Sequence, residues 1–120
     1  MDFSDKIVLV TGASRGIGKA TAMAFAEQGA TVALNYRNND QEANRTLGAL
    51  PGKDHKLFKK DIGQKDNCAA LVDAVVDEYG QLDVLVNNAG ISMFHEIDKV
   101  SFDQWTNAWQ QTFATNLFAV

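Results

Sequence analysis

Short apolar segments alternate with longer segments of helical periodicity along the 120 residues of the chain. The first apolar segment, residues 7–10, contains only branched aliphatic side chains, which is typical of a strand buried on both faces of a sheet. Such alternation with short connections predicts βαβ units and a parallel sheet with helices on both faces. We expect further strands at residues 31–34, 56–60 and 84–86, and a last helix that begins with a capping box at Ser101.

The connections of these βαβ units determine the order of the strands. Crossovers between parallel strands are right-handed, so we predict a doubly wound sheet with the strand order 3-2-1-4 in the part present. Ligands bind such a sheet beyond the carboxyl ends of its strands, where the strand order reverses. The predicted fold class is therefore α/β, and the predicted binding crevice lies beyond the first and fourth strands.

The charge and the rare residue types of the chain disfavour several kinds of partner. The formal net charge is −4 and no basic stripe dominates, which argues against nucleic acid. The single cysteine, Cys68, allows no intrachain disulfide, and the apolar runs are too brief to span a bilayer. His55 and His95 lack partners at metal-ligand spacing. We expect a cytoplasmic protein with no metal site and no membrane partner.

A glycine-rich segment, residues 11–18, lies between the first strand and the first helix, with the spacing G-x-x-x-G-x-G. Glycines permit a tight turn close to a pyrophosphate, and the helix behind them supplies free N–H groups. The phosphate loop of nucleotide hydrolases fits less well, because five residues separate Gly12 from Gly18 and Ala20 offers no hydroxyl for magnesium. Taken alone, the segment is also compatible with a tight turn that binds no ligand.

Two later motifs follow the third and fourth predicted strands. They are Asp61-Ile62 and the Asn-Asn-Ala-Gly sequence at 87–90. Together with Thr-Gly-Ala-Ser-Arg-Gly-Ile-Gly at 11–18 and with Asn116, their order and spacing resemble the short-chain dehydrogenase/reductase family. The resemblance covers essentially all 120 residues, and within the family the segment is similar to bacterial 3-oxoacyl carrier-protein reductases.

The resemblance implies a Rossmann-type domain in an oxidoreductase that moves a hydride between NADP(H) and a ketone or secondary alcohol. It also implies that the glycine segment surrounds the pyrophosphate and that Asp61 accepts a hydrogen bond from the adenine amine. A helix N-terminal acid is the alternative for Asp61. Asn87 is implied to tie the central strands together. The implied cofactor contacts are Gly12, Ser14, Arg15, Gly16, Ile17, Gly18, Asp61, Ile62, Asn88, Ala89 and Gly90.

The residues after the second strand bear on the choice between the two nicotinamide cofactors. Tyr36 and Arg37 stand where NAD-specific relatives carry an Asp for the ribose hydroxyls. Arg37 can pair with a 2′-phosphate, and Arg15 can approach the same phosphate from the glycine segment. We therefore predict a preference for NADP(H) over NAD(H). The alternative for Arg37 is a solvated surface charge.

Asn116 is the one candidate catalytic residue. It follows Thr112 by four residues and Trp109 by seven, which predicts a place on the inward stripe of the last helix. The resemblance implies that this Asn holds a water that links the catalytic Lys to solvent. The alternative is a helix-bending amide that bonds to a neighbouring strand.

The family's other catalytic residues, a Ser and a Tyr-x-x-x-Lys, are not found in these 120 residues. The only tyrosines are Tyr36 and Tyr79, and each is followed four places on by an Asp. We therefore expect residues 1–120 to be the N-terminal portion of a longer single domain, without strands 5–7 of the sheet, and to be inactive alone. The resemblance implies a homo-oligomer at full length.

Two other functions stay open as alternatives at this stage. The chain is also compatible with a non-catalytic nucleotide-binding fragment or a module that pairs with another chain. A methyltransferase on the same type of sheet is disfavoured by the Asn-Asn-Ala-Gly loop and by Asn116. In the isolated piece, residues 84–86 are expected to form an uncovered edge strand, next to an exposed apolar stripe on the last helix.

Overall fold

The computed structural model describes residues 2–91 and 100–119, in which the strands form one parallel sheet. The strands are β1 (Ile7–Val10), β2 (Thr31–Tyr36), β3 (Lys56–Lys59) and β4 (Val84–Val86). Their order is β3-β2-β1-β4, which confirms the predicted doubly wound topology. The helices are α1 (Gly16–Glu27), α2 (Asp40–Ala49), α3 (Lys65–Tyr79) and α4 (Phe102–Phe113), and α4 continues into a π-helical turn, η1 (Ala114–Phe118).

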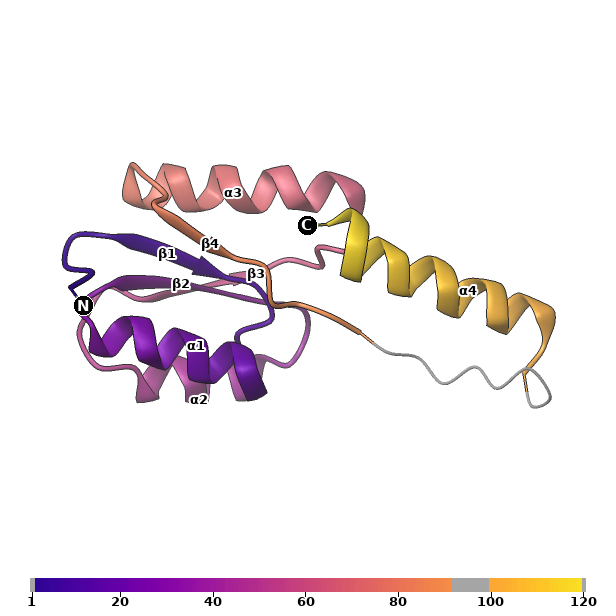
Figure 1. Ribbon diagram of the computed structural model, residues 1–120, viewed down its shortest axis with the longest axis horizontal. Coiled ribbons are helices and arrows are strands. Elements are labelled where there is room, and N and C mark those ends of the chain that lie inside the picture. Colours follow the sequence, from indigo (N-terminus) through magenta and orange to yellow (C-terminus); the bar gives the residue numbers. More distant parts are fainter. Residues whose placement is uncertain (1, 92–99, 120) are drawn as a thin grey trace.

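Helices cover both faces of the sheet, with α1 and α2 on one side and α3 on the other (Figure 1). Successive side chains of β1 point to opposite faces, so Val8 and Val10 join the core beneath α1 while Ile7 and Leu9 join the core beneath α3. All four residues of β1 are buried. This two-sided burial explains why the strand is apolar at every position.

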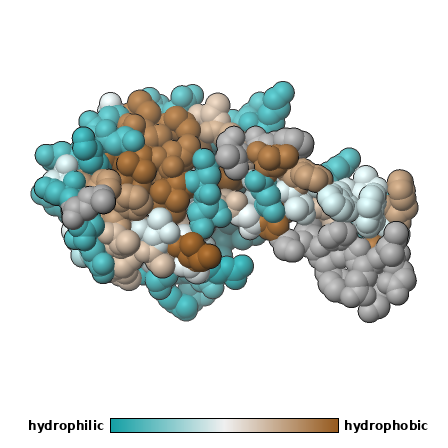
Figure 2. All heavy atoms as spheres, in the orientation of Figure 1, coloured by the Kyte–Doolittle hydropathy of each residue, from teal (hydrophilic) through white to brown (hydrophobic). Residues whose placement is uncertain are grey.

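The strand β4 lies at one end of the sheet, and its far edge pairs with no strand in the described part of the chain. Leu85 in this strand is 46% exposed, and Val76 on the neighbouring helix α3 is 39% exposed. A hydrophobic surface is visible in this region in Figure 2. The apolar edge that we predicted at residues 84–86 is thus present.

The helix α4 extends away from the sheet (Figure 1). It begins with the predicted capping box, in which the Ser101 hydroxyl accepts from the Gln104 N–H and the Gln104 side chain accepts from the Ser101 N–H. Its aromatic side chains contact one another along one face, with ring centroids 5.8 Å apart for Trp105 and Trp109 and 5.2 Å apart for Trp109 and Phe113.

This apolar stripe is exposed, as we expected for residues 1–120 alone. Phe102 is 78% exposed, Trp109 40% and Leu117 57%, while Ala108 is buried. The stripe has helical periodicity, but the body of the sheet does not cover it. No helix in the described ranges is both long and apolar enough to cross a membrane.

Candidate cofactor-binding site

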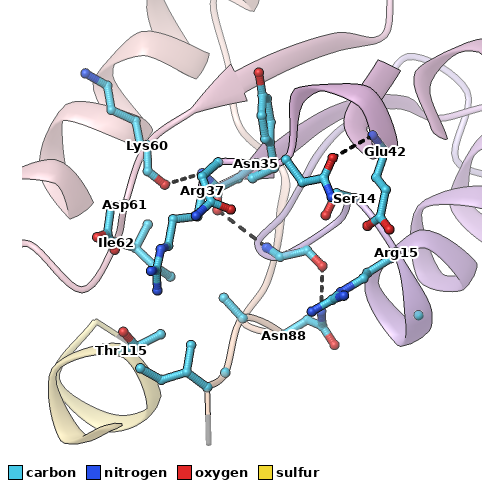
Figure 3. Close-up of a pocket in the computed structure, with 18 residues that line it drawn as sticks. Ser14, Arg15, Asn35, Arg37, Glu42, Lys60, Asp61, Ile62, Asn88 and Thr115 are labelled. Carbon is cyan, nitrogen blue, oxygen red and sulfur yellow. Dashed lines mark hydrogen bonds between the residues drawn. The ribbon is translucent and has the colours of Figure 1, made fainter. Parts of the chain in front are cut away.

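A pocket of about 590 Å³ lies at the carboxyl ends of the strands, where the topology predicted a binding crevice. Its walls come from the loops after β1, β2, β3 and β4, from the first turn of α2 and from η1 (Figure 3). Segments that are far apart in the sequence therefore meet in one cavity. The predicted contacts that line it are Gly12, Ser14, Arg15, Gly16, Arg37, Asp61, Ile62, Asn88, Ala89 and Gly90.

Two predicted contacts, Ile17 and Gly18, do not line this pocket. Ile17 is 78% exposed at the start of α1. Gly18 is buried beneath the glycine loop, where an added Cβ would lie 2.1 Å from the Gly12 carbonyl oxygen and 2.6 Å from the Asn88 Nδ2 atom. Gly18 is therefore required for packing of the loop, whether or not a ligand binds.

The glycine loop approaches the loop after β4 very closely at Gly12. This residue has φ +62°, and a Cβ at this position would lie 2.9 Å from the Cα of Ala89. A side chain would thus be both strained and obstructed here. Gly16 also has a positive φ, +60°, but a Cβ there would meet nothing within 4 Å, so its neighbourhood on the pocket side is open.

The start of α1 has free N–H groups on the pocket side. Its N-cap residue, Arg15, is extended and makes no side-chain capping bond, and the first turn contains no acidic residue. A helix N-terminus of this kind carries a partial positive charge and N–H donors without acceptors. These are the features that bind a phosphate.

The loops after β1 and β4 are cross-linked by Thr11 and Asn88. The Thr11 hydroxyl accepts from the N–H groups of Asn88 and Ala89 at 3.0 Å, and the Asn88 side-chain amide donates to the carbonyls of Thr11 and Gly12 at 3.1 Å. The predicted role of Asn87 is therefore not observed. The Asn87 side chain is exposed and makes no hydrogen bond to the described residues, whereas its neighbour Asn88 bonds to the loop after β1.

A buried amide at the end of β2, Asn35, joins three segments and was missed by the sequence analysis. Its Nδ2 atom donates to the carbonyls of Phe58 at 3.1 Å and Lys60 at 3.2 Å, and its Oδ1 atom accepts from the Gly12 N–H at 3.4 Å. Asn35 is only 2% exposed. A polar residue directly after the apolar strand run was the available signal, since a buried amide needs such partners.

The helix α2 contributes two further residues that the sequence analysis missed, Glu42 and Thr46. The Thr46 hydroxyl donates to the Ser14 carbonyl at 2.6 Å and is almost completely buried. Glu42 lines the pocket. The two are four residues apart and share one face of the helix, so their spacing was the available signal.

The end of β2 is held by a small polar cluster of Tyr36, Asp40 and Lys59. The Tyr36 hydroxyl donates to Asp40 at 2.6 Å, and Lys59 lies 3.0 Å from the same carboxylate. The hydrogen bond to Asp40 raises the pKa of Tyr36, and the bonds from Tyr36 and Lys59 lower the pKa of Asp40. Arg37 directly follows Tyr36, is exposed and lines the pocket.

Asp61 lines the pocket and also holds the turn that precedes α3. Its Oδ1 atom accepts from the Gly63 N–H at 3.0 Å, while the N-cap position of α3 belongs to Gln64. The Asn67 side chain donates to the Asp61 carbonyl at 3.0 Å and fixes the main chain here. Asp61 thus stabilises the turn before α3, outside the helix N-terminus at which the alternative placed it, and also borders the cavity.

The family model for short chain dehydrogenases matches residues 6–120, which is nearly the whole chain. The chain belongs to the short-chain dehydrogenase family. This confirms the resemblance inferred from the glycine segment, the Asp-Ile pair and the Asn-Asn-Ala-Gly loop. The family's nucleotide-binding fold agrees with the sheet order and with the pocket at the strand ends.

Several relatives of this short-chain dehydrogenase are known. It is 31% identical to an L-rhamnose 1-dehydrogenase (NADP(+)) of Thermoplasma acidophilum over 98% of this chain and 47% of the relative. It is 37% identical to a 3-oxoacyl-[acyl-carrier-protein] reductase of Staphylococcus aureus over 96% of this chain and 46% of the relative. The chain thus spans about half the length of the curated relatives it matches.

A solved structure shares the fold of this short-chain dehydrogenase. A short chain dehydrogenase from Burkholderia cenocepacia, in complex with NADP, superimposes with a TM-score of 0.88 at 32% identity. The match covers 99% of this chain and 48% of that one.

In this short-chain dehydrogenase, Asn116 lies beside the pocket and does not line it. Its Oδ1 atom accepts from the Ile91 N–H at 2.7 Å and its Nδ2 atom donates to the Ile91 carbonyl at 2.8 Å. The predicted inward position of Asn116 is wrong, because it is exposed and its neighbour Thr115 is buried and faces the pocket. The π-helical turn η1 changes the helical phase that the prediction assumed.

The described residues contain no group of three or more His, Cys, Asp or Glu side chains that could hold a metal ion. His55 lies in the described part, where its Nδ1 atom accepts from the Val32 N–H at 3.0 Å. His95 lies outside the described residues. The polar residues that line the pocket carry amide, hydroxyl, guanidinium, amino and carboxylate groups.

Proposed function

We propose that the chain forms the NADP(H)-binding part of an oxidoreductase that acts on a ketone or secondary alcohol. The observation that carries this proposal is the pocket at the strand ends, which joins the glycine loop to Arg37, Asp61 and the loop after β4. The NADP present in the similar dehydrogenase from Burkholderia cenocepacia supports the choice of cofactor.

The residues of the pocket fit a phosphorylated dinucleotide. The uncapped N-terminus of α1 and the open space at Gly16 suit a pyrophosphate. Arg15 and Arg37 supply two cations, and the strand-end position that carries an acid in NAD-specific relatives is occupied by Tyr36 and Arg37. When bound, the nicotinamide supplies the hydride donor or acceptor, and the residues of this chain bind and orient the adenosine half.

Titration of NADP⁺ and NAD⁺ against the full-length protein tests the proposal. We expect tighter binding of NADP⁺, and Arg37→Ala should weaken NADP⁺ binding by about tenfold or more, since one charge-assisted contact to the phosphate is lost. The same variant should leave NAD⁺ binding nearly unchanged. Equal affinities for the two cofactors, unaltered by Arg37→Ala, would contradict the proposed preference.

We also propose that residues 1–120 alone do not catalyse carbonyl reduction. Reduction leaves an alkoxide that needs a proton, and no Tyr-x-x-x-Lys is present in these residues to supply one. Purified residues 1–120 should therefore show no oxidation of NADPH with ketones or 3-oxoacyl thioesters. Turnover comparable to that of the full-length protein would refute this. A full-length protein that binds NADP(H) without turnover would favour the non-catalytic nucleotide-binding module instead.

A homo-oligomer and a cytoplasmic location are further parts of the proposal. The exposed apolar side chains of α4, with Phe102 at 78% and Leu117 at 57% exposure, support a contact with a second copy. The molar mass of the full-length protein in solution, measured by light scattering, tests the first point. A monomer at micromolar concentration would contradict it.

A further inference from the structure

The first turn of α2 contains two acidic residues, Asp40 and Glu42, whose surroundings differ. Asp40 bonds to Tyr36 and pairs with Lys59, and it does not line the main pocket. Glu42 lines the pocket, and its Oε2 atom is buried with no hydrogen-bond partner among the described residues. Burial of a carboxylate oxygen without a hydrogen-bond partner costs free energy of folding, so the position of Glu42 in the pocket needs an explanation.

The main chain of α2 holds Glu42 in this position. Its N–H donates to the Asn39 side chain at 3.0 Å, which caps the helix, and Thr46 one turn later bonds to Ser14 in the glycine loop. The side chain of Glu42 points from α2 toward the part of the pocket where Arg15 lies (Figure 3). The two described ion pairs, Lys56–Glu78 and Lys59–Asp40, do not include Glu42.

The charges that line the pocket are therefore mixed. Arg15 and Arg37 are the cations proposed to receive a 2′-phosphate, and Lys60 and Asp61 also line the pocket. Glu42 adds a negative charge on the side where Arg15 lies (Figure 3). A phosphate monoester carries about −1.5 to −2 charges at neutral pH. A carboxylate nearby repels it, whereas the uncharged ribose hydroxyls of NAD(H) experience no such repulsion.

We propose that Glu42 is a specificity-determining residue that limits the preference for NADP(H) over NAD(H). The inference rests on the proposed function, because it assumes that the adenosine ribose lies near Arg15 and Arg37. The carboxylate of Glu42 weakens the binding of a 2′-phosphate and leaves the binding of NAD(H) largely unchanged. A chain with a neutral residue at this position would discriminate more strongly against NAD(H).

Glu42 also has a structural role that the test must separate from this one. An acid in the first turn of a helix stabilises that helix through its dipole. Loss of that effect would lower the stability of the protein and weaken the binding of both cofactors to the same extent. The repulsion instead changes the ratio of the two affinities, so the ratio of the dissociation constants is the measurement that distinguishes the two roles.

The experiment measures the dissociation constants of NADP⁺ and NAD⁺ for the full-length protein by calorimetry. The adenosine fragments 2′,5′-ADP and 5′-AMP are titrated in parallel, because they report on the phosphate without the nicotinamide. Glu42→Gln and Glu42→Ala remove the charge, and Glu42→Asp keeps it. The matched control is Asp66→Asn, which removes an exposed first-turn acid of α3 that does not line the pocket.

We expect Glu42→Gln to tighten NADP⁺ and 2′,5′-ADP binding by about three- to tenfold, and to change NAD⁺ and 5′-AMP binding by less than about twofold. Glu42→Ala should change the affinities in the same direction, so the test can still be read if one of the two variants folds poorly. Glu42→Asp and Asp66→Asn should keep the wild-type ratio. An unchanged ratio in both charge-removing variants, or an equal change for both cofactors, would overturn the inference.

Failure of the proposed function gives a different result. A wild-type protein that binds NAD⁺ at least as tightly as NADP⁺ would contradict the proposed preference. The effect of Glu42 would still be readable from the ratio of 2′,5′-ADP to 5′-AMP affinity in the variants. A wild-type preference for NADP⁺ with no effect of Glu42 would overturn the inference alone.

Discussion

The side-chain hydroxyl of Thr46 donates a hydrogen bond of 2.6 Å to the main-chain carbonyl of Ser14. This bond joins the middle of α2 to the centre of the glycine loop, across 32 positions of sequence. Thr46 is 1% exposed, so its hydroxyl is shielded from solvent and the Ser14 carbonyl is its only partner among the described residues. The conformation of the glycine loop, which borders the pocket, thus depends on α2, the helix that follows β2.

Thr46→Val should destabilise the protein and loosen the glycine loop. Val has nearly the same shape as Thr but no hydroxyl, so the Ser14 carbonyl loses its donor at a cost of about 1–3 kcal/mol. We expect a lower free energy of unfolding in urea and an affinity for NADP⁺ that falls several-fold. Thr46→Ser keeps the hydroxyl and serves as the control. Wild-type cofactor binding by Thr46→Val would show that the bond does not position the loop.

Gly16→Ala and Gly18→Ala should both lower the free energy of unfolding, but by different amounts and for different physical reasons. At Gly16 the space is open but φ is +60°, so Ala costs about 1–2 kcal/mol of backbone strain. At Gly18 a Cβ would meet the Gly12 oxygen at 2.1 Å and disturb the bonds of Asn88, at a cost of about 2–5 kcal/mol. Urea unfolding without cofactor measures both. A Gly18→Ala variant more stable than Gly16→Ala would contradict the packing role of Gly18.

Asn116→Ala should lower turnover more than it weakens cofactor binding. The amide bonds to both main-chain groups of Ile91 and does not line the pocket, so the affinity for NADP(H) should be nearly unchanged. The family resemblance implies that Asn116 holds a proton-relay water, so we expect its loss to lower kcat by about tenfold or more.

The control for this prediction is Asn107→Ala, which changes an exposed asparagine of α4 that does not line the pocket. Steady-state kinetics and an NADP⁺ titration on the same full-length preparations give both quantities. Full turnover in a folded Asn116→Ala variant would show that the amide is structural only.

Asp83 should make the stability of the protein depend on pH in the acid range. Its Oδ2 atom accepts from the Ile7 N–H at 2.8 Å and from Gln81 at 2.7 Å. The bond from Ile7, followed by that from Gln81, lowers the pKa of Asp83 below its ordinary value of 3.8. A lowered folded-state pKa means that this stabilisation is present above the unfolded-state pKa and is lost as the pH falls through the folded-state value.

Asp83→Asn should therefore be less stable than the wild type at neutral pH, and the difference should shrink as the pH falls below 3.8. Urea unfolding at several pH values measures the difference. Asp73→Asn, an exposed acid on α3, is the control. A difference that stays constant down to pH 2 would contradict the role of the Asp83 charge.

Much of the fold could be predicted from local patterns in the sequence. The apolar run at residues 7–10 predicted β1, and the capping box at Ser101 predicted the start of α4. Gly80 ends α3 in the left-handed conformation that this position requires. The strand order followed from the handedness of the crossovers. These features depend on residues that are close in sequence, or on general rules of chain connection.

The family motifs also led to most of the pocket, because the carboxyl ends of parallel strands lie at one edge of the sheet. What the tertiary structure alone decided is how the walls are joined. Asn35, Glu42 and Thr46 bond to or border segments more than 20 positions away, and a pattern along the chain does not identify such partners. The sequence likewise did not show that Asn88, rather than Asn87, bonds to the loop after β1, 76 and 77 positions away.

The last helix shows most clearly that a sequence pattern does not identify the contacts of a side chain. Its helical spacing predicted an inward Asn116, but helical periodicity indicates only which side chains share a face. Whether that face is covered depends on what lies opposite it, and in the described residues Trp109 and Leu117 remain exposed. The π-helical turn at Ala114–Phe118 then directs Thr115 rather than Asn116 to the pocket. The sequence by itself thus determined the elements and their order, while contacts between distant segments determined which side chains form the site.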